Sequence, residues 1–168
     1  MVEFKSAVEL TAVLVNHSRV SMADTARRSD ARRILLVDDY VEVRDAVREA
    51  LEERGYAVVE AAHGQQALHY LVSHAPGAVD LIVLDLVMPV MDGWQFLRVA
   101  SNYVGLMRIP VVIVSGHPPR LNQTNHRGVI GVLHAPYEMR ELIALVAAGL
   151  SPDPSSGPPT APRARSAR

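Results

Sequence analysis

The chain has 168 residues, of which 49% are hydrophobic and 21% charged, a composition typical of globular proteins that excludes a wholly disordered chain. No apolar run approaches the roughly 18 to 20 residues that a membrane-spanning helix needs, and Met1–Val20 is a poor secretory signal. The absence of cysteine excludes disulfides, thiolate metal sites and a cysteine nucleophile. The net charge of -1 gives no general attraction for nucleic acid, so neither nucleic acid nor a membrane is expected as a partner.

Charge and composition divide the chain into three parts. Residues 1–33 carry six basic and four acidic side chains, residues 34–150 eight basic and thirteen acidic, and residues 151–168 three arginines and one acid. The last part holds five of the eleven prolines and nothing apolar larger than alanine, so it is expected to be disordered. A basic arm that touches nucleic acid is the alternative, although it lacks an aromatic side chain for stacking. We therefore expect an extension over residues 1–32, one folded domain over 33–150 and a disordered tail over 151–168.

The N-terminal extension has one candidate element. Ser6–His17 places apolar residues at helical spacing, whereas the polar stretch that follows it is typical of a linker. The extension is predicted to be partly helical or disordered and open to proteolysis. Docking against the domain, as an intramolecular cover or in a dimer, is the alternative, and translation from Met22 would remove most of the segment.

Strand and helix patterns alternate from Arg33 to Leu150. Short apolar runs predict buried parallel strands, and apolar residues at i, i+3, i+4 and i+7 predict amphipathic helices. In chain order we expect a strand at Ile34–Asp38, a helix around Val43–Leu51 that ends before Gly55, a strand at Tyr56–Ala62, a helix at Gln65–Val72, a strand at Leu81–Asp85, a helix at Gly93–Ala100, strands at Pro110–Ser115 and Val129–His134, and a helix at Glu138–Ala148. Five such units predict a doubly wound α/β sheet.

Acidic and hydroxyl side chains follow three of the predicted strands. Asp38 and Asp39 come after the first strand, Asp85 ends the third and Ser115 ends the fourth. Ligands of such sheets bind beyond the carboxyl ends of the strands, where three converging carboxylates would raise the pKa of at least one of them. Mg²⁺ prefers one or two carboxylates and several waters, so it suits this set. Taken alone, Asp39 has a plain alternative role as a helix N-cap.

These motifs resemble the receiver domain of two-component response regulators over about 70% of the chain, from Arg33 to Leu150. The matching segments are LLVDDY at Leu35–Tyr40, LIVLDLVMPVMDGW at Leu81–Trp94, VVIVSG at Val111–Gly116 and VLHAPYEMREL at Val132–Leu142. The resemblance implies a flavodoxin-like, five-stranded parallel sheet with strand order 2-1-3-4-5.

The resemblance also implies the role of each site residue. Asp85 would accept a phosphoryl group from a phosphohistidine, and Ser115 would hydrogen-bond a phosphoryl oxygen. Asp38, Asp39, Asp85 and the backbone carbonyl of Val87 would hold Mg²⁺. A carboxylate is a competent nucleophile for phosphoryl transfer, and the loose transition state needs mainly positioning and charge neutralisation.

One feature of the family is absent. Where receivers have a lysine before the proline that follows the fifth strand, this chain has Ala135, and its only lysine is Lys5. His134 precedes Ala135, and on a strand its side chain would point to the opposite face, so it is expected to be an ordinary exposed histidine rather than a substitute cation.

Two further departures concern the face through which receivers usually signal. The aromatic switch residue of the family corresponds to Val132. The stretch Gly116–Arg127 is shorter than usual and contains Pro118 and Pro119, so the helix after the fourth strand is predicted to be short or to start late.

Other chemistry-bearing residues receive plain structural interpretations. The seven histidines are scattered without a clear metal-ligand spacing, so surface positions are favoured over a zinc site. Trp94 and Tyr137 are interpreted as packing residues.

The sequence thus predicts a cytoplasmic, single-domain response regulator that is not an enzyme, since no output domain fits in the short ends. Its expected partners are a histidine kinase or phosphotransfer protein and an output protein of unknown identity, and a homodimer is left open. The alternative is a pseudo-receiver, a scaffold that binds partners without phosphorylation-driven switching. A hydrolase that uses the acid cluster is disfavoured because no suitable general base is evident.

Overall fold

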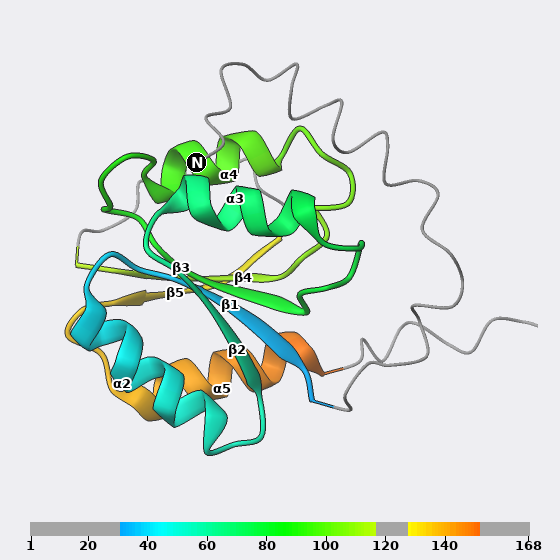
Figure 1. Ribbon diagram of the computed structural model, residues 1–168. Coiled ribbons are helices and arrows are strands. Elements are labelled where there is room, and N and C mark those ends of the chain that lie inside the picture. Colours follow the sequence, from blue (N-terminus) through cyan, green and yellow to red (C-terminus); the bar gives the residue numbers. More distant parts are fainter. Residues whose placement is uncertain (1–30, 117–127, 152–168) are drawn as a thin grey trace, which may run out of the picture.

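The computed structural model of the protein describes residues 31–116 and 128–151. This part of the chain forms a twisted parallel sheet covered by helices on both faces (Figure 1). The strands are β1 (Arg33–Val37), β2 (Ala57–Ala61), β3 (Leu81–Asp85), β4 (Val111–Ser115) and β5 (Val129–His134). The helices are α2 (Val41–Glu52), α3 (Gly64–Ser73), α4 (Gly93–Ala100) and α5 (Met139–Leu150).

The strands lie in the order β2-β1-β3-β4-β5, and every neighbouring pair is parallel. From β1 the chain goes to β2 at one edge of the sheet and then crosses back over β1 to β3. The remaining strands are added on that side, so the order of the strands reverses direction between β1 and β3. This is the doubly wound topology, and it confirms both the predicted fold class and the order 2-1-3-4-5.

Two apolar clusters hold the helices to the sheet. The helices α3 and α4 cover one face, and α2 and α5 cover the other (Figure 1). Alternate residues of each buried strand serve the two faces: Leu35 and Val37 of β1 pack under α3 and α4, whereas Ile34 and Leu36 pack under α2 and α5. Because both faces are buried, β1 and β3 are nearly continuous apolar runs, which is why both strands could be recognised in the sequence.

The observed boundaries of the other elements differ from the predicted ones by one or two residues, whereas those of β3, α4 and β5 are the same. Strand β1 ends at Val37, and the side chain of the next residue, Asp38, accepts a hydrogen bond from the Tyr40 backbone N–H. Helix α5 starts one residue later than predicted, since Glu138 is its N-cap and forms a capping box with Glu141. Gly55 was predicted to end the first helix. It follows the end of α2 and has a φ of +83°, a backbone conformation that favours glycine.

Several predictions lie outside the described residues. These are the helix at Ser6–His17, the short helix expected after Gly116 and the disordered tail beyond Ser151. Within the part that the structure describes, no helix combines the length and the apolar composition needed to span a bilayer.

Candidate functional site

The structure brings together the three carboxylates that the sequence singled out. Asp38 and Asp39 follow β1, Asp85 ends β3, and these two strands are neighbours in the sheet. Oxygen atoms of the three carboxylates all lie within 4.8 Å of one another. Among residues 31–116 and 128–151, this acidic trio is the one group of His, Asp or Glu side chains close enough together to hold a metal ion.

Asp38 is the most deeply buried member of the trio. The residue is 6% exposed, and its Oδ1 accepts a hydrogen bond of 2.8 Å from the backbone N–H of Tyr40. Burial raises the pKa of Asp38 from 3.8 to about 6; the Tyr40 N–H opposes this rise, and the charges of Asp85 and Asp39 add to it. The sequence predicted a raised pKa from repulsion alone, whereas the structure makes desolvation the larger cause.

Asp39 does not have the helix-capping role that was its plain alternative. The N-cap of α2 is Tyr40, and no side chain caps this helix. Instead, Oδ1 of Asp39 is buried without a hydrogen-bond partner among the described residues. A buried, unpaired carboxylate oxygen is costly unless a cation or donor meets it. Three oxygen ligands at this spacing fit a hard cation such as Mg²⁺.

Asp85 is positioned by the close approach of α4 to the end of β3. Its Oδ1 accepts from the backbone N–H of Leu86 at 2.7 Å, and the N–H of Gly93 donates to the Leu86 carbonyl at 3.1 Å. A Cβ at position 93 would overlap the Asp85 backbone carbonyl oxygen, so only glycine permits this approach. Asp92 and Gln95 complete a capping box that starts α4 at this point.

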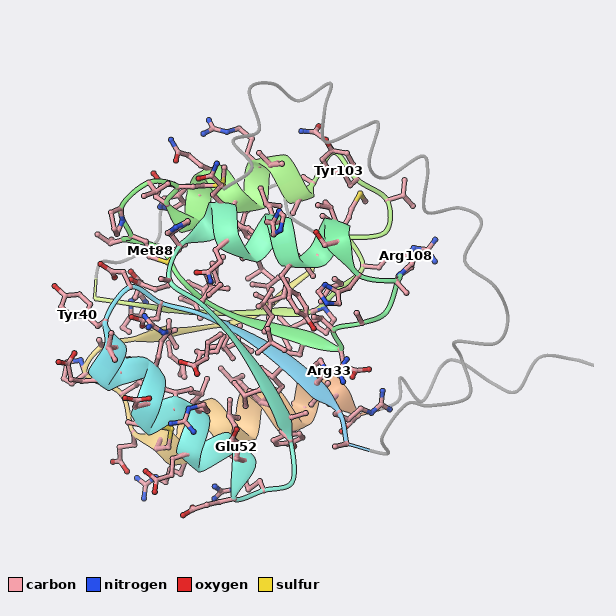
Figure 2. All side chains as sticks on the ribbon, in the orientation of Figure 1. Arg33, Tyr40, Glu52, Met88, Tyr103 and Arg108 are labelled. Atoms are coloured by element: carbon pink, nitrogen blue, oxygen red, sulfur yellow. The ribbon has the colours of Figure 1, made fainter. Side chains whose placement is uncertain are left out.

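Ser115 ends β4 next to β3 and is 3% exposed. Its backbone carbonyl accepts from the N–H of Ala135 at 3.0 Å, which holds the turn after β5 against the end of β4. Ser115, Ala135 and all three carboxylates line one pocket of about 740 Å³ at the carboxyl edge of the sheet. The labelled Tyr40 and Met88, which also line this pocket, lie at the same side of the molecule in Figure 2.

The remaining candidates lie as follows. Val87 lines the pocket, and the role of its backbone carbonyl as a metal ligand stays a prediction. His134 is exposed and is not among the lining residues, in agreement with its interpretation as an ordinary histidine. His63 caps α3 by accepting from the Gln66 N–H, and His74 stacks on Tyr70, so both have structural roles.

Three lining or supporting residues were not singled out from the sequence as part of the site. Glu42 adds a fourth carboxylate to the pocket wall, and Tyr137 lines the same pocket. Arg44 donates to the Asp38 backbone carbonyl at 2.7 Å and pairs with Glu60 at 3.3 Å, which ties the loop after β1 to β2. Their positions, four and six residues after Asp38, could have indicated that Glu42 and Arg44 lie near the site. The helical pattern instead led to both being interpreted as solvent-facing residues.

Comparison with known proteins agrees with this geometry. The family described as the response regulator receiver domain matches residues 34–147. The chain is 34% identical to the alkaline phosphatase synthesis transcriptional regulatory protein SphR of Synechococcus elongatus, over 69% of this chain and 48% of that protein. It is 27% identical to sporulation initiation phosphotransferase F of Bacillus subtilis, over 66% of this chain and 86% of that protein. The chain spans half or less of the length of the first curated relatives that it matches.

Solved structures with the same fold cover a similar share of the chain. The chemotaxis response regulator CheY4 of Vibrio cholerae superimposes with a TM-score of 0.63 at 26% identity, over 71% of this chain and 99% of that one. The receiver domain of the hybrid histidine kinase CckA gives a TM-score of 0.59 at 34% identity, over 71% and 99% of the two chains. The fold, the acidic trio and the family match lead to one conclusion: this chain belongs to the response regulator receiver domain family of two-component systems.

Proposed function

We propose that the protein is a cytoplasmic response regulator that accepts a phosphoryl group on Asp85 from a histidine kinase or phosphotransfer protein and signals through protein–protein contacts. The observation that carries the proposal is the buried, unpaired Oδ1 of Asp39, within a trio whose oxygens lie no more than 4.8 Å apart. Asp85 and Ser115 line the same pocket as this trio. The relatives named as a transcriptional regulatory protein and a phosphotransferase support signalling by this route.

The chemistry follows from the placement of these side chains. A carboxylate oxygen of Asp85 attacks the phosphorus of a phosphohistidine, the new O–P bond forms as the N–P bond breaks, and the imidazole leaves with the bonding electrons and takes a proton from solvent. The hydroxyl of Ser115 donates a hydrogen bond to a phosphoryl oxygen. Asp38, Asp39 and Asp85 would hold Mg²⁺, which would supply positive charge to offset the negative charge of the phosphoryl oxygens. The phosphoryl group stays on the chain, so the protein is an acceptor and not an enzyme that acts on an external substrate.

Intact-mass spectrometry tests the proposal. The full chain is incubated with Mg²⁺ and a small-molecule phosphoryl donor, and then with a phosphorylated histidine kinase. Wild type is expected to gain one phosphoryl group, and Asp85→Asn to gain none. Asp45→Asn is the matched control, because Asp45 is an exposed carboxylate on α2 whose partner is Arg48. Labelling of Asp85→Asn to the wild-type extent would reject Asp85 as the acceptor.

A second candidate is the pseudo-receiver, which binds partners without phosphorylation. The observation that favours it is Ala135, which lines the pocket where the family has a lysine. The variant Ala135→Lys separates the two candidates. If wild type never gains phosphate from either donor while Ala135→Lys does, the pocket has lost its function as an acceptor and the scaffold is the better description.

A further inference from the structure

The pocket at the carboxyl edge of the sheet has many acceptors and few donors. Four carboxylates line it, those of Asp38, Asp39, Glu42 and Asp85. Among the described residues that form its wall, none is a lysine, arginine or histidine. Once attached to Asp85, a phosphoryl group carries about 1.5 to 2 negative charges in place of the single charge of the carboxylate, and it presents three strong acceptor oxygens. The phosphorylated state therefore depends on every hydrogen-bond donor that the wall can offer.

Three side chains with a hydroxyl donor line the pocket: Ser115, Tyr40 and Tyr137. Ser115 already has an assigned role. Tyr40 is 65% exposed, and Figure 2 shows it projecting outward from the edge of the molecule. Water competes fully for a donor in such a position, so Tyr40 adds little.

Tyr137 is placed differently from Tyr40. It follows the turn formed by Ala135 and Pro136, which the N–H of Ala135 anchors to the Ser115 carbonyl at 3.0 Å. Its ring is half-buried against the apolar cluster under α2 and α5, so its position is fixed by packing. Its hydroxyl makes no hydrogen bond to any residue that the structure describes.

The electrostatic surroundings of Tyr137 favour a protonated hydroxyl. Burial, followed by the charges of Asp38 and Asp85, raises the pKa of Tyr137 above its ordinary value of 10.0. The hydroxyl is thus a neutral donor at physiological pH, and it lies close enough to the acidic trio to feel the charge of two of its members. With no acceptor among the described residues, this hydroxyl is available to donate to an anionic oxygen.

We propose that the Tyr137 hydroxyl donates a hydrogen bond to the phosphoryl group on Asp85, and so supplies part of the stabilisation that a cation at position 135 would otherwise give. This inference rests on the proposed function and adds to it a residue that contacts the transferred group. A hydrogen bond to a charged group contributes enough that its loss weakens binding by about tenfold or more.

Binding of beryllofluoride measures this contribution without the kinase. Its fluorine atoms stand in for the phosphoryl oxygens when beryllium attaches to the aspartate carboxylate. Isothermal titration calorimetry is performed on the full chain in Mg²⁺, for wild type, Tyr137→Phe and the matched control Tyr40→Phe. We expect Tyr137→Phe to lower the beryllofluoride affinity about tenfold, with the melting temperature and the affinity for Mg²⁺ alone unchanged. Tyr40→Phe is expected to bind as wild type does.

A second comparison uses the Ala135→Lys background. There the introduced ammonium takes over the phosphoryl charge, so removal of the Tyr137 hydroxyl should weaken binding much less than it does in wild type. Equal affinity of wild type and Tyr137→Phe would overturn the inference and leave Asp85 as the acceptor. An equal loss in Tyr40→Phe would also overturn it, as would a lower affinity of Tyr137→Phe for Mg²⁺ alone. If wild type binds no beryllofluoride and takes up no phosphate, the proposed function fails and the inference fails with it.

Discussion

Removal of the charge on Asp38 should make the metal-free protein more stable. Burial raises the pKa of this residue from 3.8 to about 6, so the folded chain holds the proton more tightly than the unfolded chain does. The stabilisation that comes with this proton is fully present below about pH 4 and is lost as the pH rises through about 6. A difference of about 2 in pKa corresponds to roughly 3 kcal/mol, which is the amount by which ionised Asp38 lowers the free energy of unfolding at neutral pH.

The variant Asp38→Asn removes this charge and keeps an oxygen that can accept from the Tyr40 N–H. At pH 7.5 without divalent cations we expect it to be about 1 to 3 kcal/mol more stable than wild type, the lower value allowing for relaxation around the site. For a domain of this size, 1 kcal/mol corresponds to a change of about 4 °C in melting temperature. Urea denaturation from pH 4 to pH 8, followed by circular dichroism, gives the free energy of unfolding directly.

The pH dependence decides whether the buried charge is the cause. The stability difference between Asp38→Asn and wild type should shrink as the pH falls from 7 to 4. The matched control is Asp45→Asn, which removes an exposed carboxylate from α2 and should change stability by less than about 0.5 kcal/mol. An Asp38→Asn variant no more stable than wild type at pH 7.5, or a difference independent of pH, would refute the reasoning.

Further substitutions probe the geometry around the site. Gly93→Ala should lower the free energy of unfolding by about 2 to 4 kcal/mol in urea melts, because its Cβ would overlap the Asp85 carbonyl, whereas Gly105→Ala, with open space around it, should change little. Val90 has a φ of +67°, so Val90→Gly should stabilise by about 0.5 to 1 kcal/mol, while Val104→Gly, similarly exposed, should destabilise. Millimolar Mg²⁺ should raise the melting temperature of wild type more than that of Asp39→Asn, and the gain should fall below about pH 6 as Asp38 takes up its proton; an equal gain in both proteins would exclude Asp39 as a ligand.

The parts of the fold that sequence analysis predicted best are those set by local pattern. The limits of β3, α4 and β5 agree with their predicted ranges, because buried strands and amphipathic helices have distinct apolar periodicities. The placement of Asp38, Asp39 and Asp85 at one edge followed from the rule that parallel strands end together.

What sequence analysis did not predict depends on tertiary packing. That desolvation dominates the pKa of Asp38 is decided by how completely neighbouring elements cover it. The position of Tyr137 in the pocket wall depends on the turn at Ala135 and Pro136, which two residues of sequence do not specify. The positive φ of Val90 is a third case, since valine is a residue that ordinarily avoids it.

The salt bridge between Arg32 and Asp80 has a practical consequence for attachment of the protein to other molecules. Together with the Arg33 N–H, which donates to Asp80 at 2.8 Å, it fixes the entry of the chain at the amino edge of the sheet, and Figure 2 shows Arg33 on the side away from Tyr40. Helix α5 ends at this edge too, since Gly149 lies against Leu81, the first residue of β3. A fluorophore, surface linker or fused reporter joined at Ala31 or Ser151 would thus start about 16 Å, the length of a five-residue strand, from the acidic pocket. Single-molecule and biosensor formats can therefore use either junction and keep the label at the opposite end of the strands from the pocket.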